Sequence, residues 1–485
     1  MHVTTTSAFD PPPGEVVEWT AFPAPGHEFT PSEVPPSLNQ RFHLDGIAAG
    51  GAPHWLACAF DLPGERDTAA LAEAFGRWVR RHPGLLSRFT ERGGEIGRAV
   101  LDPDAVALHR EDAGEFRTSA AVRAHLARRF AEQCHPLRWP PFLLGAIRHE
   151  RGMTVFAAFD HSCADAQSMA VAAHEIQVLY RAAARGEEAA LPAVGDFVAH
   201  CAAEHAAVAA ARVDAVRTTP EPGWDAPGLE VLGAPPAPIG EHPAVTYWRD
   251  FLLDCGGTTP AFPLELGVRP GEPVPQRSTT DRLLDAESAD AFDAACRSAA
   301  GSVFTGLLAA AGLALRDLGA EDRIGLLVPL HTRREPRWRH AVGWFTTNAP
   351  IAFNVVDSRF AETHTHAKVA FREALGTLGV PLPTVLAAVA DDYERVRRDI
   401  FMLSYVDYRG MPVSLEFPES RPRHISSETV ADDVQLWVSR TADGLFLRTR
   451  LPGTPEAEAA VRGFRARLVA ALTAAARRPV AVRAG

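Results

Sequence analysis

The chain has 485 residues, of which 46% are apolar and 22% are charged, and its formal net charge at pH 7 is −11. A chain of this length exceeds the usual size of one domain, so we expect two or more structural units. The negative charge argues against a broad basic surface for nucleic acids, and no apolar run approaches the ~20 residues that span a bilayer.

Prolines are frequent in the first forty residues. They predict an extended N-terminal arm over residues 1–40, which lies on the body of the protein rather than folding as part of it. The dense apolar run at 55–62 predicts a strand. Asp67 is the expected N-cap of the helix that follows, and a second helix is expected over 119–134.

Two further strands are expected at 142–147 and 154–159 because both segments are short and continuously apolar. An apolar stripe with helical spacing then predicts a helix over 167–183. Residues 41–210 are therefore predicted to form an N-terminal lobe of mixed α/β structure. The next stretch, 211–245, becomes rich in Pro and Gly, and we interpret it as a segment that crosses between two lobes.

Residues 246–485 are predicted to form a C-terminal lobe, which again mixes helices and strands. Asp443 and Gly444 separate two apolar runs and predict a tight hairpin. Thr454, followed by a proline, predicts the start of the last helix. The other elements expected in this lobe are helices near 288–299 and 302–318 and strands at 324–330, 351–356, 401–406, 434–440 and 445–450.

The six cysteines show no CxxC pair and no metal-ligand spacing, which is typical of reduced thiols in a cytoplasmic protein. The N-terminus lacks the basic and apolar regions of a signal peptide, so we expect a cytoplasmic location. The chain also lacks a P-loop, a dinucleotide-binding glycine fingerprint, an HExxH motif and a GxSxG elbow. Nucleotide-dependent, zinc-protease and serine-hydrolase functions are therefore disfavoured.

The informative segment is residues 159–166, where an apolar strand leads into His161 and an aspartate, Asp165, follows four residues later. A histidine at a strand end beside a helix N-terminus can be kept partly desolvated and neutral, which suits a general base. Asp165 can orient the loop by pairing with a buried arginine, and it can equally cap the following helix. Cys163 has no activating histidine at a suitable spacing, so we interpret it as a residue without a catalytic role. By itself this HxxxD spacing is a weak signal.

The motif resembles HHxxxDG, the active-site motif of peptide-synthetase condensation domains and related CoA-dependent acyltransferases. Further segments resemble landmarks of that family in the same order, and they lie at 81–89, 136–143, 247–250 and 343–350. Short stretches also resemble the polyketide-synthase-associated acyltransferases of actinobacteria, in particular those that acylate trehalose in cell-envelope glycolipids. These stretches are 32–37, 343–346, 404–407 and 436–438. The resemblance covers roughly residues 30–475.

This resemblance implies an α/β fold (α+β in the wider sense) with two chloramphenicol-acetyltransferase-like lobes in a V and an active-site tunnel between them. It implies an acyltransferase that moves a fatty, polyketide or other acyl group to a hydroxyl or amine of a small acceptor. The donor would be acyl-CoA or a phosphopantetheinyl carrier protein, which is a co-substrate, and no bound cofactor or metal is expected. His161 would be the general base, and Asp165 would be structural and paired with Arg333.

The sequence departs from the family pattern at three positions: Asp160 replaces the first histidine, Ala166 replaces the glycine, and Thr347 followed by Asn348 shifts the usual asparagine by one residue. The side chains expected to line the tunnel are Asp160, Ala166, Trp344, Thr347, Asn348 and Ser404. Two of them have a simpler interpretation as well, because Trp344 can be core packing and Ser404 can belong to a turn. Arg333 can also form an ordinary solvated pair with Arg334.

Two other functions are open at this point. A stand-alone, amide-forming condensation enzyme would differ only in its acceptor. A non-catalytic condensation-like module that binds a carrier protein would explain the imperfect motif. A His161 ring turned away from the junction of the lobes would favour the second alternative.

Overall fold

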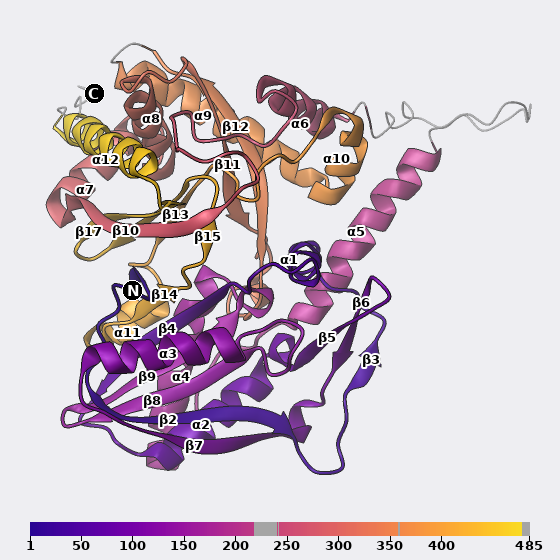
Figure 1. The fold of residues 1–485 in the computed structure, drawn as a ribbon, viewed down its shortest axis with the longest axis vertical. Coiled ribbons are helices and arrows are strands. Elements are labelled where there is room, and N and C mark those ends of the chain that lie inside the picture. Colours follow the sequence, from indigo (N-terminus) through magenta and orange to yellow (C-terminus); the bar gives the residue numbers. More distant parts are fainter. Residues whose placement is uncertain (218–239, 241, 357–358, 478–485) are drawn as a thin grey trace, which may run out of the picture.

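The computed structural model describes residues 1–217, 240, 242–356 and 359–477. Two α/β bodies lie one above the other, and each is built on a seven-stranded sheet (Figure 1). The mixed α/β fold predicted from the sequence is confirmed. Most of the predicted crossing segment, 211–245, lies outside the described residues.

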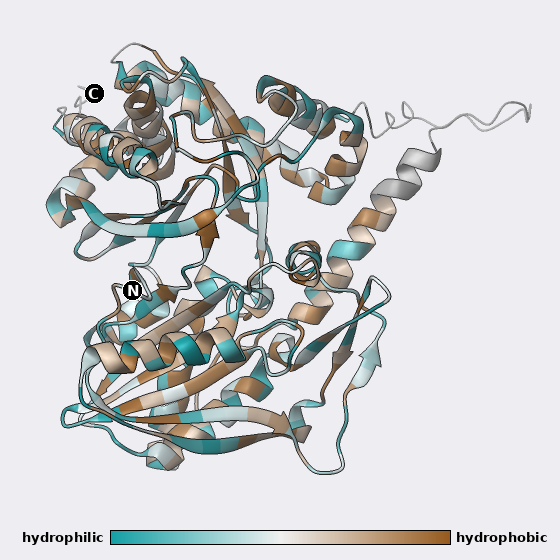
Figure 2. Cartoon of the chain, viewed as in Figure 1, coloured by the Kyte–Doolittle hydropathy of each residue, from teal (hydrophilic) through white to brown (hydrophobic). Residues whose placement is uncertain are grey.

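The N-terminal sheet has the strand order β1-β14-β4-β9-β8-β2-β7. Its strands are β1 (His2–Thr5), β2 (Gly14–Pro23), β4 (Trp55–Pro63), β7 (Val106–Phe116), β8 (Phe142–His149), β9 (Gly152–Asp160) and β14 (Arg423–Ser426). One face packs against α2 (Thr68–Arg81) and α4 (Ala166–Arg185), and the other packs against α3 (Ser119–Gln133). Because both faces are covered, every residue of β9 is buried, which explains its continuous apolar run (Figure 2).

Strand β2 corrects the prediction for the N-terminal arm. It pairs with both β7 and β8 inside the sheet, and Val17 and Trp19 on it are fully buried. The prolines at 11–13 precede this strand and Pro23 ends it, so they stand where strands tolerate proline. Residues 14–23 therefore form a buried strand of the sheet, and the prediction of a surface arm over residues 1–40 is wrong for this segment.

The C-terminal sheet has the strand order β12-β11-β13-β16-β17-β10-β15. Its strands are β10 (Val274–Asp285), β11 (Arg323–His331), β12 (Thr346–Asn354), β13 (Met402–Asp407), β15 (Val430–Ala431), β16 (Gln435–Thr441) and β17 (Gly444–Pro452). The largest apolar core lies on one face, under α7 (Ala286–Ser298), α8 (Val303–Arg316), α9 (Phe360–Gly376) and α12 (Pro455–Ala476). The other face packs in part against α6 (Pro243–Asp254) and α10 (Leu382–Ala388).

One strand of the C-terminal half belongs to the N-terminal sheet. After β13 and the short helix α11 (Pro412–Glu416), the chain crosses and β14 pairs with β4 and β1. It then returns through β15 to the C-terminal sheet. The predicted boundary at 246 overlooks this exchange, which places His424 opposite Cys58 of β4.

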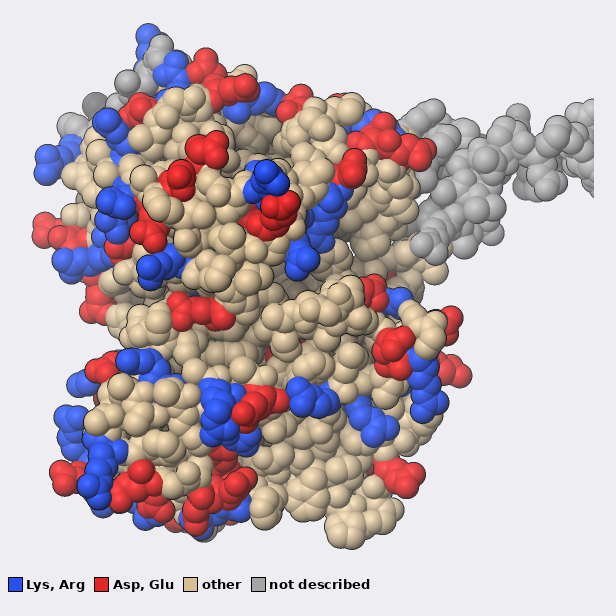
Figure 3. All heavy atoms as spheres, viewed as in Figure 1, with Lys and Arg blue, Asp and Glu red and all other residues tan. Residues whose placement is uncertain are grey.

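Two helices lie at the junction between the bodies, namely α1 (Leu38–Ala48) and α5 (Phe197–Arg217) (Figure 1). A small sheet of β3 (Thr30–Ser32), β6 (Glu95–Val100) and β5 (Ser87–Arg92) flanks them. Charged side chains of both signs are scattered over the face in Figure 3 without a one-signed patch. Among the described helices, none by itself is long and apolar enough to cross a membrane, and α7 with α8 reaches that composition only as a pair bent by 99°.

Candidate active site

The backbone around His161 forms a tight turn between β9 and α4. Strand β9 ends at Asp160, a single 3-10 turn covers residues 161–163, and Asp165 is the N-cap of α4. The Asp160 carboxylate accepts a hydrogen bond of 2.8 Å from the Ser162 amide. The His161 amide donates to the carbonyl oxygen of His54 at 2.8 Å. These bonds fix the histidine at the strand end, where the sequence analysis places it.

The His161 ring is half-buried and lies against the second body of the protein. Trp344 stacks on it with a centroid distance of 3.9 Å and an interplanar angle of 30°. Nδ1 is buried and forms no regular hydrogen bond with any described residue, whereas Nε2 keeps contact with solvent-accessible space. Burial lowers the pKa of His161, and its own backbone carbonyl opposes this only in part. The ring is therefore a neutral imidazole with one accessible nitrogen.

The ion pair expected between Asp165 and Arg333 is present in the structure. Arg333 donates to both carboxylate oxygens, from Nη1 at 2.6 Å and from Nη2 at 2.9 Å. The amide and hydroxyl of Ser168 also donate to Asp165, each at 2.8 Å, and the amide of Phe345 does so at 3.1 Å. Burial would raise the pKa of Asp165, but Arg333 and the Ser168 donors outweigh it and lower the pKa. Asp165 is thus both a helix cap and an ion-pair partner.

Arg333 fastens the second body to α4. Its Nη2 also donates to the carbonyl oxygen of Ala341 at 3.1 Å, and its guanidinium lies over the Phe345 ring, 4.3 Å from the centroid. Its neighbour Arg334 is exposed and donates to the carbonyl of Leu378 instead. The alternative of a solvated arginine pair is therefore excluded. Because these contacts hold residues 341–345, they also hold Trp344 against His161.

Helix α1 supports the histidine turn from the other side, and the sequence analysis did not identify it. The side-chain amide of Gln40 donates to the carbonyl oxygen of Ser162 at 2.6 Å. Nε2 of His43 lies 3.0 and 3.1 Å from the two carboxylate oxygens of Asp160. The side chain of Asn39 donates to the carbonyl of Thr346 in the second body. Helix α1 therefore contacts both the turn and the segment that carries Trp344.

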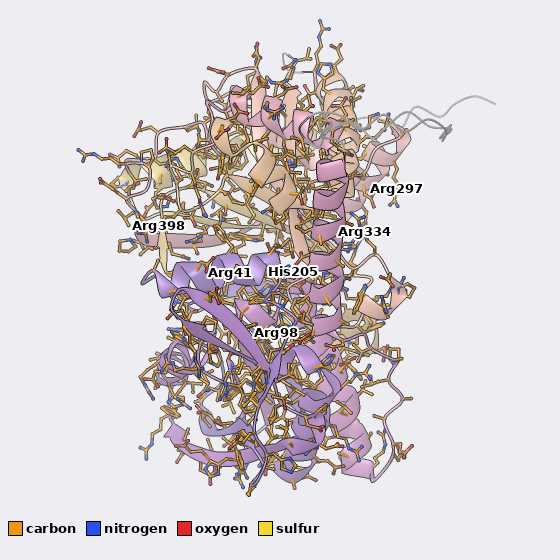
Figure 4. All side chains as sticks on the ribbon, turned by 90° about the vertical axis from the view of Figure 1, so that its right-hand side faces the viewer. Arg41, Arg98, His205, Arg297, Arg334 and Arg398 are labelled. Carbon is orange, nitrogen blue, oxygen red and sulfur yellow. The ribbon has the colours of Figure 1, made fainter. Side chains whose placement is uncertain are left out.

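The position of α1 is itself fixed by its neighbours. Arg98 donates to the Gln40 amide oxygen at 2.9 Å, and Nε2 of His205 lies 2.7 Å from the carbonyl oxygen of Pro36 (Figure 4). Ser37 and Gln40 form a capping box. That Ser-x-x-Gln pattern is a sequence signal for a helix start, so it could have revealed α1. It could not have revealed that α1 meets the His161 turn.

The side chains predicted to line a tunnel differ in their burial and in their contact with His161. Asp160 is fully buried and bound by His43 and Ser162. Trp344 is partly exposed and contacts His161 directly, and Ala166 is partly exposed at the start of α4. The other three residues lie on the C-terminal sheet and form no hydrogen bond or ring contact with His161 within the described chain; they are Thr347, Asn348 and Ser404. The tunnel itself stays a prediction.

His424 is a further residue near the site that the sequence analysis did not identify. It reaches the site on the crossing strand β14, and its Nδ1 lies 3.4 Å from the hydroxyl of Tyr408. Burial, together with the nearby Arg448 and His161, lowers the pKa of His424 to about 3. It is therefore neutral at physiological pH. Within the described residues, no three His, Cys, Asp or Glu side chains converge so that they could hold a metal ion.

Comparison with known proteins gives matches along the whole chain. The sequence profile of the condensation domain family matches residues 46–214. The trehalose-2-sulfate acyltransferase PapA2 of Mycobacterium tuberculosis (strain ATCC 25618 / H37Rv) is 28% identical over an alignment of 478 residues, and the match covers 96% of this chain and 95% of that protein. The 2'-acyl-2-O-sulfo-trehalose (hydroxy)phthioceranyltransferase PapA1 of Mycobacterium tuberculosis (strain CDC 1551 / Oshkosh) is 27% identical over 428 residues, which are 85% of this chain and 76% of that protein.

Solved structures agree with these sequence matches. The structure of PapA2 acyl transferase has a TM-score of 0.82 and 26% sequence identity, and the match covers 99% of this chain and 100% of that chain. The first condensation domain of the calcium-dependent antibiotic synthetase, in complex with a substrate analogue, has a TM-score of 0.66 at 16% identity and covers 94% of this chain and 97% of that chain. At 16% identity, the match to the condensation domain shows a shared fold and does not show a shared function. The resemblance found in the sequence is thereby confirmed: the condensation domain profile matches residues 46–214, and over nearly its whole length the chain is similar to acyltransferases.

Proposed function

We propose that this acyltransferase esterifies a hydroxyl of a small, sugar-like acceptor with an acyl group from a CoA or carrier-protein thioester, and that His161 is the general base. The observation that carries the proposal is the His161 ring, which is neutral and half-buried and lies where the two bodies meet. Relatives that match along nearly the whole chain carry names that state acyl transfer to trehalose-2-sulfate, which supports a hydroxyl acceptor.

In the proposed reaction, Nε2 of His161 accepts the proton of the acceptor hydroxyl while the oxygen attacks the thioester carbonyl. The tetrahedral intermediate then collapses, the carbon–sulfur bond breaks, and the proton passes from His161 to the departing thiolate. A new ester and a free thiol result. Burial supports this role, because a lowered pKa keeps the imidazole unprotonated at neutral pH and ready to accept a proton.

Asp165 and Arg333 act as positioning residues in this proposal. The carboxylate of Asp165 is saturated by Arg333, Ser168 and Phe345, so it has no free acceptor with which to take a proton from a substrate. Its contacts instead hold the start of α4 against the second body. The positive end of the α4 dipole lies at the same place, where it would stabilise a developing oxyanion.

The two alternatives receive less support from these observations. The His161 ring faces the second body rather than turning away from it, which does not fit the non-catalytic module. Amide formation would use the same base with an amine acceptor, so the acceptor has to be tested directly. The names of the two mycobacterial relatives, PapA2 and PapA1, support a hydroxyl acceptor.

The proposal is tested by identifying the product. The purified protein is incubated with a long-chain acyl-CoA, or the matching acyl carrier protein, and with trehalose, trehalose-2-sulfate or an amino-acid amide, and the products are analysed by mass spectrometry. We expect an acyl ester of a sugar and one equivalent of released thiol. Formation of an amide only, or of free fatty acid only in the presence of every acceptor, would contradict the proposal.

A further inference from the structure

One arginine near the site has no counter-charge. Arg448 on β17 is only 6% exposed, yet it forms no hydrogen bond or ion pair with any residue that the structure describes. Its Nε is buried without a partner, whereas its two terminal nitrogens keep contact with solvent-accessible space. Its guanidinium lies over the neutral Trp437 ring, 4.3 Å from the ring centroid. Burial lowers the pKa of Arg448 to about 10, so it is still charged at neutral pH.

The strand register shows which way Arg448 points. Its direct cross-strand neighbours are Trp437 on β16 and Thr280 on β10, and Trp437 in turn is opposite Ser404 on β13. Residues directly opposite one another share a face of a sheet. The leucines at the intervening positions, such as Leu436 and Leu447, belong to the large apolar core on the other face. Arg448 therefore projects from the face that does not carry this core.

That face lies toward the N-terminal body at the site. His424 of β14 lies close enough to both Arg448 and His161 for each of them to lower its pKa. Tyr408, whose hydroxyl is 3.4 Å from Nδ1 of His424, is also near Arg448. His424 is thus near both the unpaired guanidinium and the proposed base.

Among the residues that the structure describes, no carboxylate forms an ion pair with the Arg448 guanidinium. Arg450, two residues along the same strand, forms an ion pair with Asp399, in which Nη1 lies 2.7 Å from a carboxylate oxygen. Glu428 is close enough to raise the pKa of Arg448, but it is exposed and accepts hydrogen bonds from Ser7. His424 is neutral and carries no charge of its own. A buried, uncompensated charge is costly to a folded protein, so a site that keeps one is prepared for an anion from outside.

We propose that Arg448 binds an oxyanion carried by the acceptor, a sulfate or phosphate ester group, and so selects acceptors that bear one. The proposal rests on the proposed function and adds a specificity residue to it. An arginine is suited to this role because its planar guanidinium pairs with two oxygens of such a group at once. An anionic substituent on a small sugar stays within a few atoms of the reacting hydroxyl. The phosphates of CoA, by contrast, lie at the far end of the pantetheine arm from the thioester.

The test compares Arg448→Met, which keeps the packing on Trp437, with Arg448→Lys, which keeps the charge. Arg282→Met, on an exposed position of β10, is the matched control. Steady-state kinetics are measured with trehalose and trehalose-2-sulfate as acceptors, and with acyl-CoA and acyl-pantetheine as donors. We expect Arg448→Met to raise KM for trehalose-2-sulfate by about 10- to 100-fold and to leave KM for trehalose and for both donors unchanged. Arg448→Lys should lie in between.

Binding of trehalose-2-sulfate to each variant is measured by calorimetry, with thermal melting as the check on folding. We expect Arg448→Met to melt at or above the temperature of the wild type, since it removes an unpaired buried charge, and to lose binding. If Arg448→Met weakens the reaction with trehalose and with trehalose-2-sulfate to the same extent, and also melts at a lower temperature than the wild type, the role of Arg448 is structural. That result would overturn the proposal. A change in KM for acyl-CoA alone would assign the anion to the donor and overturn it as well. If wild-type protein esterifies no sugar but the binding difference persists, the proposed function fails and this inference stands.

Discussion

The Asp165 carboxylate receives five hydrogen bonds, and they explain why this residue is structural rather than catalytic. Two come from Arg333, two from Ser168 and one from the Phe345 amide. The last two residues belong to different bodies of the protein, so a single carboxylate holds α4 and the segment next to Trp344 together. His161 depends on this arrangement because Trp344 covers one face of its ring.

Removing the arginine while leaving the aspartate should be strongly destabilising. Arg333→Met leaves a buried carboxylate without its cation, and we expect a loss of about 3–5 kcal/mol in the free energy of unfolding, measured by chemical denaturation. Asp165→Asn keeps a good N-cap and should retain the bond with the Ser168 amide. Arg334→Met is the matched control, since Arg334 is exposed. Equal stability of Arg333→Met and Arg334→Met would contradict the role given to the ion pair.

At the scale of elements, the sequence predicted the helices and hairpins that have a clear capping or turn residue. Asp67 caps α2 as expected, and the β16–β17 hairpin turns at Gly444, which has a φ of 141°. Thr454 caps α12, also as expected. Several long elements were not predicted, and two of them lack a clear pattern in the sequence. Strand β10 is largely polar and partly exposed, and α9 carries few apolar residues on its buried side, so neither shows a clear period.

The site was predictable only in part for a related reason. His161, Asp165 and Arg333 stand in motifs whose resemblance to a family is visible in the sequence. Their supporting residues come from distant segments without such motifs: Gln40 and His43 from α1, and His424 from the strand that crosses between the bodies. Contacts of this kind depend on the tertiary fold, and a single sequence does not show them.

The importance of α1 can be tested with Gln40→Ala. This change leaves the Ser162 carbonyl without its donor and removes one acceptor of Arg98, which keeps the Pro35 carbonyl, and an unsatisfied buried group costs about 1–3 kcal/mol in stability. We expect a loss of that size in urea unfolding, together with a lower kcat because the His161 turn is less firmly held. Arg41→Ala, at the next and exposed position, removes an i,i+4 pair with Asp45 and a 3.5 Å hydrogen bond to the Gly94 carbonyl. If both variants match the wild type in kcat, α1 does not position the turn.

At the scale of the whole molecule, the two bodies are joined by more than a linker. The C-terminal half supplies β14 to the N-terminal sheet, and the Asp165–Arg333 pair bridges the bodies next to His161. Helix α1 adds a third connection through Asn39 and Thr346. The site therefore exists only when both bodies are folded and docked, which is why neither half of the sequence alone contains it.

Buried histidines make the stability of the molecule depend on pH. Burial lowers the pKa of His54 and of His424 to about 3, whereas an unfolded histidine titrates near its ordinary value of about 6.5. The unfolded state thus binds more protons below that value, and stability is fully present above it and lost as pH falls toward the folded pKa. We expect unfolding free energy to fall by about 1.4 kcal/mol per pH unit for each such histidine. His424→Gln should reduce the slope between pH 6 and pH 5 in urea titrations, and an unchanged slope would contradict this assignment.

The rate of acyl transfer by His161→Ala is the measurement that tests the central claim most directly. Thiol release from acyl-CoA is followed with trehalose-2-sulfate as acceptor, for the wild type, for His161→Ala and for His366→Ala, which changes an exposed histidine on α9. If His161 is the general base, kcat/KM falls by about 10²–10⁴-fold in His161→Ala alone, with melting temperatures unchanged. Equal rates for His161→Ala and the wild type would show that another group takes the proton.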